Sequence, residues 1–185
     1  MSSFAPSLRR APALRGALLA LALVAAAPPA SAMAPAAPAP AAPPSAAQNG
    51  TQEARNEAIV RQAFDGWVAG RDVFAALLAR DVVWTIHGSG SVAGTYRGLD
   101  DFVERASRPL LSRLATPIVP RVHHVWAVGD RVIIRFEGSA TTTSGRPYHN
   151  QFVWIFRMRD GVVAEAEAFL DLNAYQRVVD GNQPR

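Results

Sequence analysis

The sequence predicts an α+β domain, in which helices come first and a curved antiparallel sheet follows and packs on them. Apolar residues recur at helical spacing from residue 52 onwards, with charged residues between them. Nearer the C-terminus, four β-type runs follow one another and are separated by short turns, a pattern typical of an antiparallel meander.

The first 32 residues have the layout of a secretory signal peptide. A basic stretch ends at Arg15, an apolar run covers residues 16–27, and small residues precede a cleavage site after Ala32. The run is too short to cross a bilayer as a retained helix, which takes about 20 residues. The alternative is an unstructured alanine-rich tail. We expect export, so that the mature protein is periplasmic or secreted, without membrane contact after processing.

The linker and the folded domain follow this segment. Residues 33–50 are rich in alanine and proline and nearly free of charge, which predicts a polyproline-prone linker. The folded domain is expected over residues 51–185, a length sufficient for one modest hydrophobic core.

The composition of the 185-residue chain excludes several function classes. Its 19 basic residues are all arginine, so Schiff-base chemistry and P-loop phosphate binding by lysine are excluded. It contains no cysteine, which excludes disulfides, thiol nucleophiles and thiolate metal sites. The formal charge of +4 includes three arginines of the predicted signal peptide, and without them 16 arginines face 15 acidic residues. A nucleic-acid partner is therefore not expected.

Three helices are predicted before the meander. The amphipathic pattern over residues 52–69 predicts the first helix, which Gly70 ends. Asp72 is placed to cap a second, short helix. Helical spacing returns over residues 99–114, where Pro109 should break or bend the helix.

Strands are predicted by runs rich in β-branched and aromatic residues. Residues 82–86 form a strand that enters a glycine loop, and residues 92–96 form a short edge strand. The meander consists of residues 119–128, 132–141, 148–158 and 162–170. In the third of these runs, Tyr148, Asn150 and Trp154 lie on one aromatic face, which either packs on helices or lines an apolar pocket.

The order and spacing of six short motifs resemble the SnoaL-like branch of the NTF2-like superfamily, which includes relatives of ketosteroid isomerase and of limonene-epoxide hydrolase. The motifs are Trp84-Thr85-Ile86-His87-Gly88, Gly94-Thr95-Tyr96-Arg97-Gly98, Gly129-Asp130-Arg131-Val132, Gly145-Arg146-Pro147-Tyr148-His149-Asn150, Arg159-Asp160-Gly161 and Phe169-Leu170-Asp171. The resemblance implies a cone-shaped curved antiparallel sheet on three N-terminal helices, with a deep pocket between them. It also implies a homodimer formed through the outer sheet face.

The catalytic sets of these relatives are incomplete in this chain. The Arg-x-acid pair of similar epoxide hydrolases falls on Arg135 and Glu137, but their last acid falls on Ala168. Their water-holding tyrosine and asparagine fall on Trp84 and Ile86, which cannot hold a water in the same way. The tyrosine that ketosteroid isomerase relatives carry on the first helix is also missing. The alternative for Arg135 and Glu137 is an ion pair on a sheet face.

Two residues are candidate bases. His87 follows the first strand, where it can face the mouth of a pocket, and the alternative is a loop-capping histidine. Asp171 follows the last strand, where similar polyketide cyclases retain an acid, and the alternative is a helix cap. Adjacent His123 and His124 point to opposite faces of a strand and cannot share a metal ion, so neither a metal nor another cofactor is expected.

Two functions are open from the sequence. The first is an exported isomerase, cyclase or hydrolase that acts by proton transfer on a small hydrophobic molecule. Asp171 or His87 would be its base, and Trp84, Tyr148, Asn150, Trp154, Arg135 and Glu137 would bind or orient the substrate. The second is a binding protein with the same pocket and no chemistry, suggested by the apolar Ala168. An interaction module that uses the outer sheet face is a third, weaker hypothesis.

Overall fold

The computed structural model describes residues 46–185, so the predicted signal peptide and residues 33–45 of the predicted linker lie outside the described residues. Helix α1 (Ala46–Val68) begins inside the range predicted as linker and is longer than the sequence pattern indicated. Among the described residues, no helix combines the length and the apolar character needed to span a membrane.

Two short helical regions follow α1 before the meander. Asp72 caps helix α2 (Val73–Leu77), as predicted: its Oδ1 accepts hydrogen bonds from the backbone N–H groups of Phe74 and Ala75 at 2.9 and 3.1 Å. The predicted helix over residues 99–114 consists of three consecutive segments. They are α3 (Leu99–Phe102), the π-helical turn η1 (Val103–Ser107) and α4 (Arg108–Leu111).

The π-helical turn lies directly before Pro109. Proline has no backbone N–H, and in a regular α-helix its ring would clash with the carbonyl group four residues earlier. A wider turn upstream relieves this clash, so the helix continues past the proline instead of ending there.

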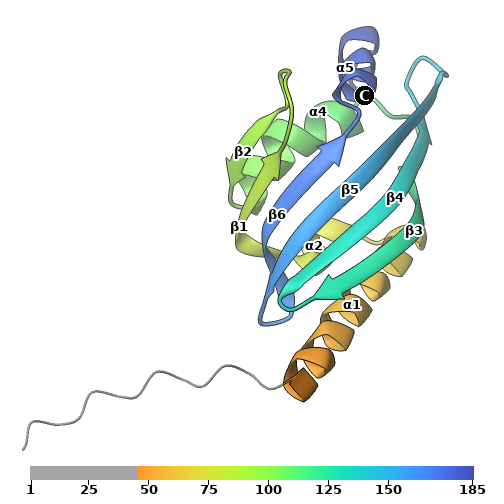
Figure 1. Cartoon of the computed structure of the whole chain (residues 1–185). Helices are drawn as coiled ribbons and strands as arrows, with labels where there is room; N and C mark the ends of the chain where they lie inside the picture. The colour runs from red at the N-terminus through yellow and green to blue at the C-terminus, as the bar shows by residue number, and fades with distance from the viewer. Residues whose placement is uncertain (1–45) are drawn as a thin grey trace, which may run out of the picture. The chain divides into compact units, whose positions relative to one another are not determined.

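The six strands form one sheet in the order β2-β1-β6-β5-β4-β3. The strands are β1 (Leu78–Ile86), β2 (Gly94–Arg97), β3 (Val119–Val128), β4 (Arg131–Thr141), β5 (Pro147–Arg159) and β6 (Val162–Leu170). Strands β3 to β6 are the predicted antiparallel meander, and only β1 and β6 pair in parallel. Figure 1 shows the curved sheet in front of α1 and α2, with helix α5 (Leu172–Gly181) where β6 ends.

The two faces of the sheet differ in burial. The inner face of β5 is buried from Tyr148 to Met158 at every second residue, as the alternation predicted. Its central ring, Trp154, packs edge-on against Phe136 at 4.7 Å and against Phe64 of α1 at 5.9 Å. The outer face carries charged residues and Trp126, whose exposed fraction is 47%. The fold predicted from the sequence, helices on a mostly antiparallel curved sheet, is confirmed.

Candidate functional site

A cavity of about 360 Å³ lies between the inner face of the sheet and the helices. This volume is at the lower end of the range of small-molecule sites. Strands β1, β5 and β6 form one wall, and α2, η1 and α4 form the other. The lining side chains are mostly apolar and include Trp67, Phe74, Trp84, Ile86, Phe102, Leu110, Leu114, Phe152, Trp154, Ala168 and Leu170.

Aromatic rings hold one another in place along this lining. The ring of Trp84 stacks on Phe102 with centroids 4.2 Å apart and meets Trp154 edge-on at 5.0 Å. Trp154 in turn lies parallel to Trp67 at 6.2 Å. Edge-to-face and offset arrangements of this kind are favourable and leave the rings little freedom. Trp84 and Trp154 line the cavity, and their role in binding a ligand stays a prediction.

The sheet side of the cavity carries no acid or base. Ile86 of β1 and Ala168 of β6 are neighbours across the parallel strand pair, and both line the cavity. Leu170 continues the same apolar surface. Among the described residues that line the cavity, Asp72 is the only carboxylic acid, and its Oδ1 already accepts the two hydrogen bonds that cap α2.

Most polar groups of the cavity are engaged within the protein. Tyr175 donates its hydroxyl proton to the carbonyl oxygen of Ala106 at 2.9 Å, and burial raises its pKa above the usual value. Thr116 accepts a hydrogen bond from the backbone N–H of Thr141. The indole N–H of Trp84 is buried and has no hydrogen-bond acceptor within residues 46–185.

Tyr148 and Asn150 are buried in the core next to the cavity and are not part of its lining. Asn150 donates from Nδ2 to the hydroxyl oxygen of Tyr148 at 3.0 Å and to the carbonyl oxygen of Asp171 at 3.0 Å. Burial raises the pKa of Tyr148 to about 12, so the hydroxyl stays protonated. Both side chains are hydrogen-bonded within the core, which matches the alternative that this face packs on other elements better than it matches ligand binding.

Asp171 is the N-cap of α5. Its Oδ1 accepts a hydrogen bond from the backbone N–H of Ala174 at 3.0 Å, and its Oδ2 lies 4.0 Å from the guanidinium of Arg177. The side chain is half exposed and does not line the cavity. The helix-capping alternative therefore describes the position of Asp171.

His87 lies on the outer face of the sheet. Its Nε2 is 2.9 Å from Oε2 of Glu167, and its ring stacks on Phe169 at 4.6 Å. The expectation that it faces the cavity mouth is not met, because Trp84 and Ile86 point inward and alternation along the strand turns His87 outward. A base at this position is separated from the cavity by the sheet.

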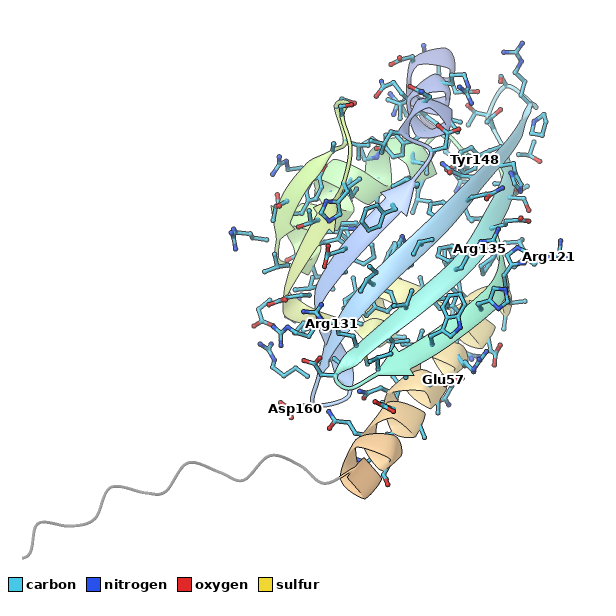
Figure 2. The ribbon with its side chains drawn as sticks, viewed as in Figure 1. Glu57, Arg121, Arg131, Arg135, Tyr148 and Asp160 are labelled. Carbon is cyan, nitrogen blue, oxygen red and sulfur yellow. The ribbon has the colours of Figure 1, made fainter. Side chains whose placement is uncertain are left out.

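Arg135 and Glu137 of β4 also lie on the outer face of the sheet. Figure 2 labels Arg135 there. Glu137 is 3.2 Å from Nε2 of His123 and 3.6 Å from Nε2 of His149. Burial would raise the pKa of Glu137, but attraction to these two histidines outweighs it, so the pKa lies below its usual value. Arg135 makes no ion pair with any described residue, so the ion pair with Glu137 that was considered as the alternative is not formed. Neither side chain lines the cavity.

Besides Thr116 and Tyr175, three polar residues that the sequence analysis did not select line the cavity. Arg71 precedes α2, Ser107 ends the π-helical turn, and Arg185 is at the C-terminal end of the described chain. Each belongs to a different segment, and none lies in a recognisable motif. The described residues contain no cluster of three or more side chains suited to a metal ion, and the expectations of no metal and no cofactor stay predictions.

Comparisons with solved structures agree with the fold. An NTF2-like protein of unknown function from Burkholderia pseudomallei K96243 has a TM-score of 0.55 at 23% identity, covering 68% of this chain and 97% of that chain. A candidate SnoaL-like polyketide cyclase from Jannaschia sp. CCS1 has a TM-score of 0.55 at 22% identity, covering 71% and 95%. TerC, co-crystallised with polyporic acid, has a TM-score of 0.56 at 20% identity, covering 68% and 98%.

The sequence itself places the chain in a family. No curated protein matches it. The SnoaL-like domain, however, matches residues 60–166, which run from within α1 to within β6 and include α2 to α4 and strands β1 to β5. The resemblance found in the six sequence motifs is thereby confirmed, and the chain belongs to the SnoaL-like domain family.

Proposed function

We propose that this chain is an exported binding protein that holds one small, largely apolar molecule in the cavity between the sheet and the helices. The observation that carries the proposal is an aromatic lining in which no described residue on the sheet side is an acid or base, since Ile86, Ala168 and Leu170 occupy it. Burial of an apolar ligand against these side chains is favourable by about 25 cal/mol per Å² of apolar area. TerC, a neighbour in fold, is crystallised with a small molecule, which supports this use of the fold.

Proton-transfer catalysis is the second candidate, and Asp72 is the residue that favours it. Among the described cavity-lining residues it supplies the only carboxylate, and its Oδ2 takes no part in the hydrogen bonds that cap α2. His87 and Asp171, the bases expected from the sequence, are both outside the lining. An isomerase or cyclase would therefore use Asp72 as its base.

The substitution Ala168→Leu tests the binding site. Ala168 is buried and lines the cavity, so a leucine there fills the space that the ligand would occupy. Binding is followed by the fluorescence of the neutral probe N-phenyl-1-naphthylamine. We expect wild type to bind the probe and A168L to lose binding while it stays folded by circular dichroism.

The matched control is Gln151→Leu, which adds an apolar side chain to the exposed outer face of β5. Q151L should bind the probe as wild type does. Equal binding by wild type and A168L would overturn the assignment of the cavity as the ligand site. If small molecules that co-purify with the protein are converted to products by wild type and not by Asp72→Asn, the catalytic candidate replaces the binding protein.

A further inference from the structure

We infer that the ligand of this cavity is an amphipathic anion, with an apolar body against the aromatic wall and a carboxylate or similar acidic group at Arg71 and Arg185. This inference rests on the proposed function and specifies the class of ligand that the same cavity takes.

Arg71 and Arg185 are far apart in the sequence, before α2 and after α5, and both line the same cavity. Neither guanidinium has a carboxylate within 4.0 Å among residues 46–185. Arg157 and Arg159 form ion pairs, whereas Arg135 on the outer sheet face forms none with any described residue. The lining therefore presents two solvent-exposed arginines without ion-pair partners beside an apolar interior.

The structure around α1 holds Arg71 in position. Gly70 adopts a φ of 84°, and the backbone N–H of Arg71 then donates to the carbonyl oxygen of Gly66 at 2.9 Å. The guanidinium lies directly over Gly66: a Cβ at that glycine would be 2.8 Å from Nε and 2.9 Å from Nη2 of Arg71. Glycine is less favourable than alanine within a helix, and here it leaves the space that the guanidinium occupies.

Arg185 is held by hydrogen bonds to the segment after α4. Its backbone N–H donates to the carbonyl oxygen of Ser112 at 2.8 Å, and its Nη1 donates to that of Ala115 at 3.4 Å. The preceding residues are anchored too, because Arg113 donates from Nε to the carbonyl oxygen of Asn182. This places Arg185 beside the cavity through several independent contacts.

The charge of the lining favours an anion. The side chains of Arg71 and Arg185 carry two positive charges, and Asp72, the only acidic side chain among the described lining residues, has one oxygen committed to the cap of α2. The fork of N–H donors on arginine matches the two oxygens of a carboxylate, and such charge-assisted hydrogen bonds are stronger than neutral ones. A neutral apolar ligand would offer neither guanidinium group a carboxylate partner.

Two fluorescent probes with the same aromatic body distinguish the contribution of charge to binding from that of apolar burial. 1-Anilinonaphthalene-8-sulfonate and N-phenyl-1-naphthylamine differ by one sulfonate group. We expect Arg71→Gln and Arg185→Gln each to weaken binding of the sulfonate by about tenfold and to change binding of the neutral probe by less than about twofold. Because the attraction is electrostatic, added salt should weaken binding of the sulfonate probe and leave binding of the neutral probe unchanged.

Gly66→Ala is the positioning variant. It leaves the charge of the protein unchanged and displaces the guanidinium of Arg71. It should therefore also weaken binding of the sulfonate probe more than binding of the neutral probe. The matched control is Arg135→Gln, which removes the same charge from the outer sheet face and should leave both probes unaffected. The substitution Ala168→Leu should abolish binding of both probes if both occupy the cavity.

The outcomes distinguish the two proposals. Equal effects of R71Q and R185Q on both probes, or no effect on either, would overturn the anion preference while the cavity stays the binding site. Binding of the neutral probe that A168L does not reduce, or no binding of either probe to wild type, would overturn the proposed function and this inference with it.

Discussion

Asn150 holds the backbone of Asp171 from both sides. Its Oδ1 accepts from the N–H of Asp171 at 2.9 Å, and its Nδ2 donates to the carbonyl oxygen of the same residue at 3.0 Å. Oδ1 also accepts from the backbone N–H of Gln151. One buried side chain thus joins β5 to the junction between β6 and α5 and defines where the last helix begins.

The substitution Asn150→Ala should destabilise the fold. It leaves the Tyr148 hydroxyl and the backbone groups of Asp171 without their partner inside the core. A buried polar group without a partner costs about 1–3 kcal/mol, so we expect a loss of at least this size in the free energy of unfolding. Urea denaturation measures it, and unchanged stability would contradict a structural role of Asn150.

Asp171 should behave as a cap and not as a base. Asparagine caps helices as well as aspartate does, whereas alanine does not. Asp171→Asn should therefore keep the stability of wild type, and Asp171→Ala should lose about 1 kcal/mol. Both variants should bind the naphthylamine probe like wild type in a fluorescence titration. Loss of binding in a folded Asp171→Asn protein would show that this residue takes part in ligand binding.

His87 should be dispensable for ligand binding, because its ring lies against Glu167 and Phe169 on the outer face. We expect His87→Ala to change the affinity for either naphthalene probe by less than about twofold, since no contact with the cavity is lost. Fluorescence titration of the folded variant measures this. A strong loss of affinity would show that the outer face communicates with the cavity.

The hydroxyl groups of the three tyrosines should lose their protons only above pH 10. The chain has three tyrosines, and burial raises the pKa of Tyr96, Tyr148 and Tyr175 above the usual 10. The folded protein therefore retains these protons at a pH where the unfolded chain loses them. Stability is fully present below pH 10 and should fall as the pH rises from 10 towards 12.

Absorbance at 295 nm, recorded against pH, follows this behaviour. We expect little tyrosinate at pH 10 and a rise that coincides with loss of the circular dichroism signal. A stepwise titration near pH 10 in the folded protein would contradict the burial of the three hydroxyl groups.

Export predicts a defined mature N-terminus. When the full chain is expressed in a secreting host, signal peptidase should cleave after Ala32, and the mature protein should begin at Met33. Mass spectrometry of the intact protein measures the cleavage site. A full-length protein that stays in the cytoplasm would contradict the proposed export. The homodimer implied by the family resemblance stays a prediction as well.

Much of the fold could be predicted because it follows from local patterns. The period of two in Tyr148–Met158 separates an inner from an outer face, and the turns at Gly129, Gly145 and Gly161 set the order of the meander. The cap at Asp72 is equally local. The helix after Leu99 was predicted less well, because a π-helical turn depends on how the chain accommodates Pro109 within the packed domain.

The candidate site was predicted only in part. The alternation along a strand shows which residues share a face, but it does not show whether each of them lines a cavity or packs against other residues. Trp154 and Asn150 share the inner face of β5, yet one lines the cavity and the other is tied to Asp171.

The sequence by itself determined the order of helices and strands, the family and the aromatic inner face, since these depend on residues close together in the chain. Only the tertiary structure decided that His87 and Glu137 face outward and that Arg71 and Arg185 border one cavity. These arrangements join segments far apart in sequence, and their geometry follows from how the helices pack on the curved sheet.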